Sequence, residues 1–189
     1  YDVLNSAEAK AEATERSLLH IIKPEIDFEP IADEHSQEVY DKAVENFRAW
    51  REKGWLEQDP GEYYYIYAQT MDGRTQYGLT MCCHYEDYLS GAIKKHELTR
   101  PDKEEDRMIH VRNQQANIEP VFFAYPDDAE IDAIVADVVK NNAPEYDFTA
   151  ADGFGHQLWV IRDRKTNDRI TEIFAGIPAL YVADGHHRT

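Results

Sequence analysis

The chain has 189 residues, of which 42% are hydrophobic, and its 37 acidic and 20 basic residues give a formal net charge of −17. This composition is typical of a globular protein and excludes a disordered or fibrous chain. The charge argues against binding to nucleic acid or to an anionic membrane surface, because both depend on a positive field.

Cellular location is indicated by the cysteines and by the apolar pattern. Cys82 and Cys83 are adjacent, so they would point to opposite faces of a strand and are not expected to pair. Free thiols, no leader peptide and no apolar run of membrane-spanning length predict a cytoplasmic protein with no membrane partner. The chain opens at Tyr1 without an initiator Met. We therefore expect a piece of a longer protein.

In chain order, a first helix is expected over residues 6–17, opened by Asn5 or Ser6 as the cap. The apolar run 18–22 predicts a strand that ends at Pro24. An amphipathic helix is expected over 36–53, because apolar side chains recur at helical spacing and Gly54 follows them.

The middle of the chain predicts antiparallel sheet. Residues 63–70 and 75–83 have the composition of two strands around an Asp72-Gly73 turn. A helical turn over 84–89 and a polar connection follow. Pro101 then opens a charged helix over 102–115, which we expect to be mostly exposed because it is polar throughout.

The last third of the chain alternates between the two kinds of element. The pattern predicts a strand over 120–125, a helix over 127–141, a hairpin from 146–149 and 157–162, a helix over 167–174 and a strand over 179–183. No internal repeat or flexible linker interrupts the chain. The sequence therefore predicts a single α+β domain over residues 1–189, with a mixed sheet and peripheral helices.

A polar cluster follows the closing strand. It consists of Asp184, Gly185, His186, His187, Arg188 and Thr189. A helix that starts near His186 would direct free backbone N–H groups at an anion, and the guanidinium and hydroxyl would hold phosphate oxygens. Asp184 is a candidate for binding a hydroxyl or supporting Mg²⁺. The alternative is a polar turn in which the histidines only cap a helix.

A second polar block precedes the charged helix. Glu97 in a partly enclosed site is a candidate general base toward a hydroxyl, with His96 beside it and Arg107 within reach of a phosphate or a carboxylate. The alternative is a solvated loop. The histidines, including His110, lack the spacing of a zinc signature, so no metal site is predicted.

Several blocks together resemble the family known as domain of unknown function 1015. The blocks are Tyr1-Asp2-Val3, residues 19–26, Tyr77-Gly78-Leu79, residues 95–101 with Asp106-Arg107, and residues 180–188. The resemblance spans essentially the whole chain. Members of the family are longer and continue through a helix and a second portion, which implies that this chain is an N-terminal part.

The Asp184–Arg188 turn is also similar to that of the ParB/sulfiredoxin superfamily, whose members bind nucleotide phosphates at the following helix. Some members are free-serine kinases in which the Glu of an upstream His-Glu pair is the catalytic base. The resemblance implies that His96-Glu97 has this place here. It also implies a ParB/sulfiredoxin-like core with an added N-terminal hairpin and helix.

Together these observations predict a phosphotransferase that uses ATP or ADP with Mg²⁺ on a small hydroxyl-bearing metabolite such as serine. The catalytic candidates are Glu97, His96 and Asp184. The phosphate-binding candidates are Arg107, Gly185, His186, His187, Arg188 and Thr189. Two alternatives are a nucleotide-binding regulatory module without turnover and a metal-dependent hydrolase.

Overall fold

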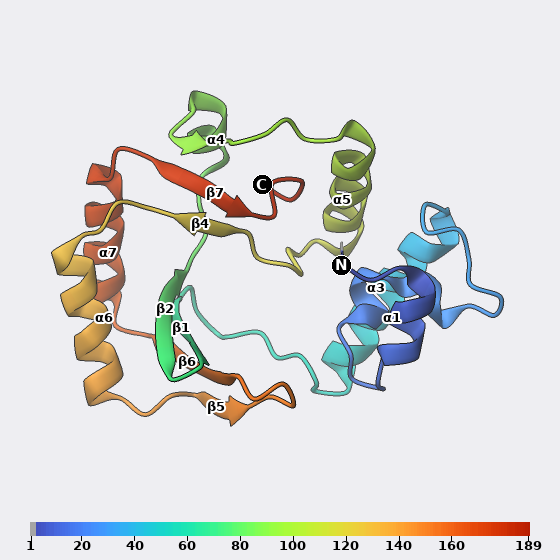
Figure 1. Ribbon diagram of the computed structural model, residues 1–189, viewed down its shortest axis with the longest axis horizontal. Helices are drawn as coiled ribbons and strands as arrows, with labels where there is room; N and C mark the ends of the chain where they lie inside the picture. The colour runs from blue at the N-terminus through green and yellow to red at the C-terminus, as the bar shows by residue number, and fades with distance from the viewer. Residues whose placement is uncertain (1–2) are drawn as a thin grey trace. The chain divides into compact units, whose positions relative to one another are not determined.

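A computed structural model describes residues 3–189, whose internal contacts form two compact units (Figure 1). The helical unit comprises residues 3–58, 95–122 and 182–189, and the sheet unit comprises Asp59–Lys94 and Phe123–Tyr181. Helices and sheets confirm the predicted α+β class, whereas the ParB/sulfiredoxin-like core and the single domain stay predictions. Tyr1 and Asp2 of the first family block lie outside the described residues.

The helical unit opens with α1 (Ser6–Glu12), which begins where the sequence predicts. The Asn5 side chain accepts a hydrogen bond from the Glu8 N–H (3.0 Å), and the Glu8 carboxylate accepts one from the Asn5 N–H (2.8 Å). This reciprocal cap satisfies two of the free donors at the helix start. The helix ends at Glu12 rather than at residue 17, because Ala13 turns to an extended conformation.

The strand predicted over residues 18–22 is wrong, because these residues form the helical turn α2 (Leu19–Ile22), followed by the 3₁₀ helix η1 (Pro24–Asp27). A five-residue apolar run does not distinguish a strand from a buried helical turn. Here only Ile21 is fully buried, and α2 packs against α3. The Asn46 side chain of α3 donates to the His20 carbonyl (2.6 Å), which fixes the turn on that helix.

The long helix α3 (Gln37–Glu52) confirms the amphipathic helix of the sequence and packs against α5 (Pro101–Gln114). α5 begins and ends within one residue of the predicted bounds, but one side of it is buried rather than exposed. Asp106, His110 and Gln114 recur every fourth residue and are all buried. Because residues four apart share one face of a helix, α5 turns a polar stripe inward.

The sheet unit contains a four-stranded antiparallel sheet of order β2-β1-β6-β5. Its strands are β1 (Tyr64–Met71), β2 (Arg74–Thr80), β5 (Tyr146–Thr149) and β6 (Gly155–Ile161). Both predicted hairpins are confirmed. Asp72 and Gly73 have φ angles of 50° and 77°, the left-handed conformation that a two-residue hairpin turn needs at both positions.

Apolar side chains of β1 and β6 form the core of this unit with α6 (Ala129–Asn141) and α7 (Arg164–Gly176). Ile66 lies opposite Trp159 in the register of β1 and β6, and both are buried. Ile131 of α6 and Ile170 of α7 are buried against them. Burying one such isoleucine side chain contributes about 1.5–3 kcal/mol, so these four residues anchor the helices to the sheet.

A three-stranded sheet has the order β3-β7-β4, with β3 (Ile93–Lys94), β7 (Leu180–Asp184) and β4 (Phe122–Ala124). The short helix α4 (Tyr85–Ser90) precedes β3 and packs against it. β3 and β7 run parallel, with Ile93 opposite Leu180. Because the carboxyl ends of parallel neighbours meet at one edge, the chain leaves both strands side by side. The two polar blocks of the sequence follow these two ends.

Candidate functional site

The Asp184–Thr189 segment folds into a tight turn directly after β7. Gly185 has φ +84°, and the Arg188 N–H donates to the Gly185 carbonyl (2.8 Å). The Thr189 hydroxyl donates to the same carbonyl (3.2 Å). Within the described residues, His186–Arg188 are therefore a hydrogen-bonded turn where the sequence predicts the start of a helix.

The Arg188 side chain folds back over this turn. Its guanidinium lies 3.6 Å from the Asp184 carboxylate, and a Cβ atom placed on Gly185 would be only 2.8 Å from the guanidinium. Only a glycine at this position leaves room for that arrangement. The turn thus holds one cation close to its own backbone, and Asp184 is the carboxylate that it faces.

His96 follows β3 and is anchored to the neighbouring strand. Its Nδ1 lies 2.9 Å from the backbone carbonyl of Val182 in β7. A carbonyl only accepts hydrogen bonds, so Nδ1 carries the proton. In the neutral ring this leaves Nε2 with a free lone pair for another partner.

Glu97 and His186 bring the two polar blocks together. The Glu97 carboxylate is in ion-pair contact with Nε2 of His186. The rings of His96 and His186 meet edge-on, with their centroids 5.3 Å apart. The ring of His187, which follows His186 in the turn, has its centroid 4.4 Å from that of His186. One ligand atom from each of His96, Glu97 and His186 lies within 4.8 Å of the other two.

Some nitrogens of this cluster are buried without a hydrogen-bond partner among the described residues. They include Nδ1 of His186 and Nε of Arg188. A buried donor or acceptor left unsatisfied costs about 1–3 kcal/mol, so such atoms call for an explanation. A ligand with acceptor oxygens would satisfy the Arg188 donor and remove part of this cost.

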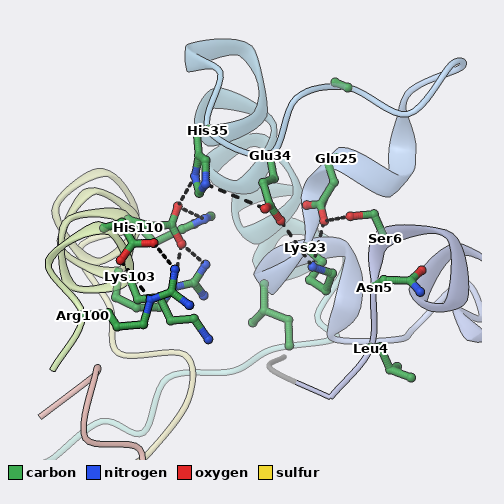
Figure 2. Close-up of a pocket in the computed structure, with 15 residues that line it drawn as sticks. Leu4, Asn5, Ser6, Lys23, Glu25, Glu34, His35, Arg100, Lys103 and His110 are labelled. Atoms are coloured by element: carbon green, nitrogen blue, oxygen red, sulfur yellow. Dashed lines mark hydrogen bonds and ion pairs between the residues drawn. The ribbon is translucent and has the colours of Figure 1, made fainter. Parts of the chain in front are cut away.

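The structure places Arg107 at a second polar site, a cleft of about 470 Å³ in the helical unit. Figure 2 shows this cleft between the helices. Nε of Arg107 donates to the Asp106 carboxylate (2.9 Å), and the guanidinium also lies 3.7 Å from Glu119. Asp106 and Glu119 thus hold the Arg107 side chain in the cleft.

Asp106 is the centre of this cleft and collects partners from several elements. The Tyr40 hydroxyl of α3 donates to it (2.9 Å). Nδ1 of His35 lies 3.3 Å away (Figure 2). Burial alone would raise the pKa of Asp106, but the charge and hydrogen bonds of Arg107, together with the hydrogen bond from Tyr40, outweigh that effect and lower it. Asp106 is therefore held as a carboxylate.

His110 lies one turn further along α5, and its ring meets the Tyr40 ring edge-on. Burial lowers the pKa of His110 to about 4, and the positive charge of Arg107 acts in the same direction. The same helix stripe thus holds an ionised acid and a neutral imidazole. Its Nδ1 is likewise buried without a hydrogen-bond partner in residues 3–189.

A buried ion pair lines the other side of the cleft. Lys23 lies 3.0 Å from the Glu25 carboxylate, and the Ser6 hydroxyl donates to the same oxygen (2.8 Å, Figure 2). Their side chains are only 7% and 3% exposed. The charged groups named here are thus paired with one another, as buried charges require.

The sequence did not lead to this cleft network. The one sign of this network in the sequence was the spacing of Asp106, His110 and Gln114, because polar residues at every fourth position lie on one face of a helix. The partners in α3 and in the loop before it, Tyr40 and His35, are distant in sequence and have no motif of their own. The network is therefore a property of the α3–α5 packing.

Comparison with known families is consistent with the blocks that carry the resemblance. A family model with the description "Protein of unknown function (DUF1015)" matches residues 1–189. Comparison with curated proteins and with solved structures gave no match. The likeness to the ParB/sulfiredoxin superfamily rests on the sequence motif and stays a prediction. None of the helices within residues 3–189 combines the length and apolar character needed to span a bilayer.

Proposed function

This chain belongs to the DUF1015 family, and on that premise we propose that it binds a nucleotide through its phosphates and transfers a phosphoryl group to a small hydroxyl-bearing metabolite. The description of the family assigns no activity, so the proposal rests on the site. Its main support is the contact between Glu97 and His186. That contact joins the proposed base to the proposed phosphate-binding turn.

The proposed reaction needs little beyond positioning and charge neutralisation. The hydroxyl oxygen of the metabolite forms a bond to the terminal phosphorus, and the bond from that phosphorus to the bridging oxygen breaks. The hydroxyl proton passes to the Glu97 carboxylate, and the shortened nucleotide leaves with the electron pair. Glu97 is half exposed, so a substrate hydroxyl can approach it once His186 turns away.

The turn supplies the proposed phosphate contacts. His186, His187 and Arg188 provide cationic or neutral N–H donors, and the Gly185 backbone and Thr189 hydroxyl add short-range contacts. Charge-assisted hydrogen bonds of this kind are the strong ones at phosphate sites. Arg107 lies instead in the cleft, beside Asp106 and Glu119.

Mg²⁺ is the proposed cofactor of the nucleotide, and the donor set fits it. Asp184 has a side chain that is 77% exposed, and its carboxylate is free to exchange Arg188 for a cation. Mg²⁺ prefers oxygen ligands and is usually held by one or two carboxylates together with substrate phosphates. Asp184 would hold it, with His96 positioning the substrate, and the ion would neutralise charge on the phosphates.

The test is direct. The purified chain is incubated with Mg²⁺, with ATP or ADP and with a panel of hydroxy-metabolites that includes serine, and products are followed by ³¹P NMR. Nucleotide binding is measured separately by calorimetry. A new phosphomonoester signal together with saturable binding is the expected result. No binding and no phosphorylation across the panel would overturn the proposal.

A non-catalytic nucleotide-binding module is the second candidate, and one observation favours it. The Glu97 carboxylate is already in contact with His186, so in this arrangement it is not available to a substrate hydroxyl. Saturable binding without any phosphorylated product would select this candidate over the enzyme.

A further inference from the structure

His96, Glu97 and His186 have the donor atoms and the mutual spacing of a metal site. Their ligand atoms lie within 4.8 Å of one another. We propose that these three side chains bind one divalent transition-metal ion, with zinc as the best match, and leave a fourth position open. The inference goes beyond the proposed phosphotransferase and does not depend on it.

The orientation of His96 supports this site independently of the spacing. Its Nδ1–H donates to the Val182 carbonyl at 2.9 Å, which fixes the tautomer and the ring. Metal-binding histidines characteristically donate their other ring N–H to a carbonyl or a carboxylate in this way. The Nε2 lone pair is thereby prepared for a cation.

The distances require a small rearrangement. Bonds from zinc to histidine nitrogen or carboxylate oxygen are about 2.0–2.2 Å, so tetrahedral donors lie roughly 3.3–3.5 Å apart. The Glu97 and His186 atoms are closer than this, so they must separate around the ion. The Glu97 side chain is 48% exposed and the His186 side chain is 24% exposed, so the carboxylate has room to move.

The donor set decides the class of metal. Two imidazoles with one carboxylate suit zinc and the neighbouring first-row ions, whereas Mg²⁺ and Ca²⁺ prefer oxygen ligands. Three protein ligands with an open fourth position are typical of catalytic rather than structural zinc sites. The cation would also replace the direct contact between Glu97 and His186 with two metal bonds.

Occupation of the site has a consequence for the proposed function. A carboxylate bound to zinc is a weaker base, so zinc is expected to inhibit phosphoryl transfer that Mg²⁺ supports. Metal binding itself is measured without any turnover. Failure of the metal inference and failure of the proposed function are therefore separate outcomes.

The experiment measures zinc and cobalt binding to the metal-free chain. Because Cys82 and Cys83 are exposed thiols, all variants carry Cys82→Ser and Cys83→Ser, which removes thiolate binding of these ions. Calorimetry is expected to give one zinc per chain. Titration with Co²⁺ is expected to give the visible absorption of a four-coordinate ion without the intense thiolate band.

Three variants test the ligand set, and one serves as the matched control. His96→Gln, Glu97→Gln and His186→Gln are each expected to weaken zinc binding at least about tenfold, whereas His84→Gln, at an exposed histidine of the sheet unit, leaves it unchanged. Circular dichroism confirms that each variant is folded. Should a variant not fold, the ring ¹⁵N shifts of His96 and His186 on zinc addition to the parent chain replace it.

Substoichiometric binding to the parent chain would overturn the inference. So would equal affinity in the parent and His186→Gln chains, or ring ¹⁵N shifts at histidines other than His96 and His186. Loss of zinc in all three ligand variants, together with the cobalt spectrum, would support it.

Discussion

The ring of His96 is fixed by the backbone carbonyl of Val182, 86 positions later in the chain, at 2.9 Å. This bond follows from the parallel pairing of β3 and β7, which ends with both polar blocks at one sheet edge. It sets Glu97 against His186. The proposals for the site all depend on that juxtaposition.

Replacing the proposed base separates catalysis from binding. Glu97→Gln keeps the shape of the side chain and removes its proton affinity, so turnover is expected to fall about 10²–10⁴-fold with little change in nucleotide affinity. Initial rates and calorimetry on the same preparation measure both quantities. Glu57→Gln, at an exposed glutamate, is the control and keeps the parental rate. Unchanged turnover in Glu97→Gln would remove Glu97 from the mechanism.

The turn depends on glycine at position 185. Gly185→Ala puts a Cβ into a φ of +84° and within 2.8 Å of the Arg188 guanidinium. We expect a loss of about 1–2 kcal/mol in the free energy of unfolding from the backbone strain, and weaker nucleotide binding because Arg188 is displaced. Urea denaturation and calorimetry measure these effects.

Gly176→Ala is the matched control for this substitution, because Gly176 ends α7 and an added Cβ meets nothing within 4 Å. The control is expected to be neutral or to stabilise by about 0.5–1 kcal/mol. Equal effects of the two substitutions would mean that the turn has no special need of glycine.

The buried pair of Lys23 and Glu25 is expected to be sensitive to loss of one partner. Lys23→Met leaves the Glu25 carboxylate buried and uncompensated, and should lower the free energy of unfolding by about 3–5 kcal/mol. Lys23→Met combined with Glu25→Leu should recover much of this loss. Denaturant titration of both variants gives the comparison.

An exposed ion pair is the control for that experiment. Arg164 and Asp168 lie 3.7 Å apart with side chains 92% and 66% exposed, so Arg164→Ala is expected to change the free energy of unfolding by less than about 1 kcal/mol. A Lys23→Met effect as small as this would show that water reaches the buried pair.

The lowered pKa of His110 predicts that the free energy of unfolding falls in acid. Its pKa of about 4 in the folded chain lies below the ordinary value of 6.5, so the unfolded chain binds the extra proton first as the pH falls. The stabilisation is complete above pH 6.5 and is lost progressively toward pH 4, by an amount on the order of 2–3 kcal/mol. Asp106 and Glu25 favour the charged ring, whereas burial, Arg107 and His35 oppose it.

The check is denaturant titration between pH 4 and pH 7. His110→Phe keeps a ring against Tyr40 and removes the titration, so its stability should depend less on pH in this window. His84→Asn, at an exposed histidine, should follow the parental curve. Parallel curves for the parent and His110→Phe would contradict the assignment.

Local patterns were enough for most of the secondary structure. Asp72-Gly73 indicated its hairpin because that turn needs two left-handed residues, and Pro101 indicated the start of α5. The apolar run around Ile21 was wrongly predicted to be a strand, because a single helical turn and a short strand have the same composition. β3 has two residues, too few for any periodicity, so its parallel pairing with β7 was not predicted.

The two blocks were anticipated as parts of one candidate site, but the direct contact between them was not. The residue types of His96-Glu97 and of the Asp184–Arg188 turn indicated their chemistry, whereas their contact depends on the pairing of β3 and β7. The inward stripe of α5 was missed because a helix with polar residues on every face is typically exposed. Only packing against Tyr40 and its helix made Asp106 and His110 interior residues.

The most direct test of the central claim, that these two blocks form one nucleotide site, is a histidine-ring ¹H–¹⁵N spectrum recorded during titration with Mg²⁺ and ADP. The ring signals of His96 and His186 are expected to shift together and to saturate at one nucleotide per chain, while the His110 signal stays in place. No shift of either ring at millimolar nucleotide, or a shift confined to His110 in the cleft, would contradict it.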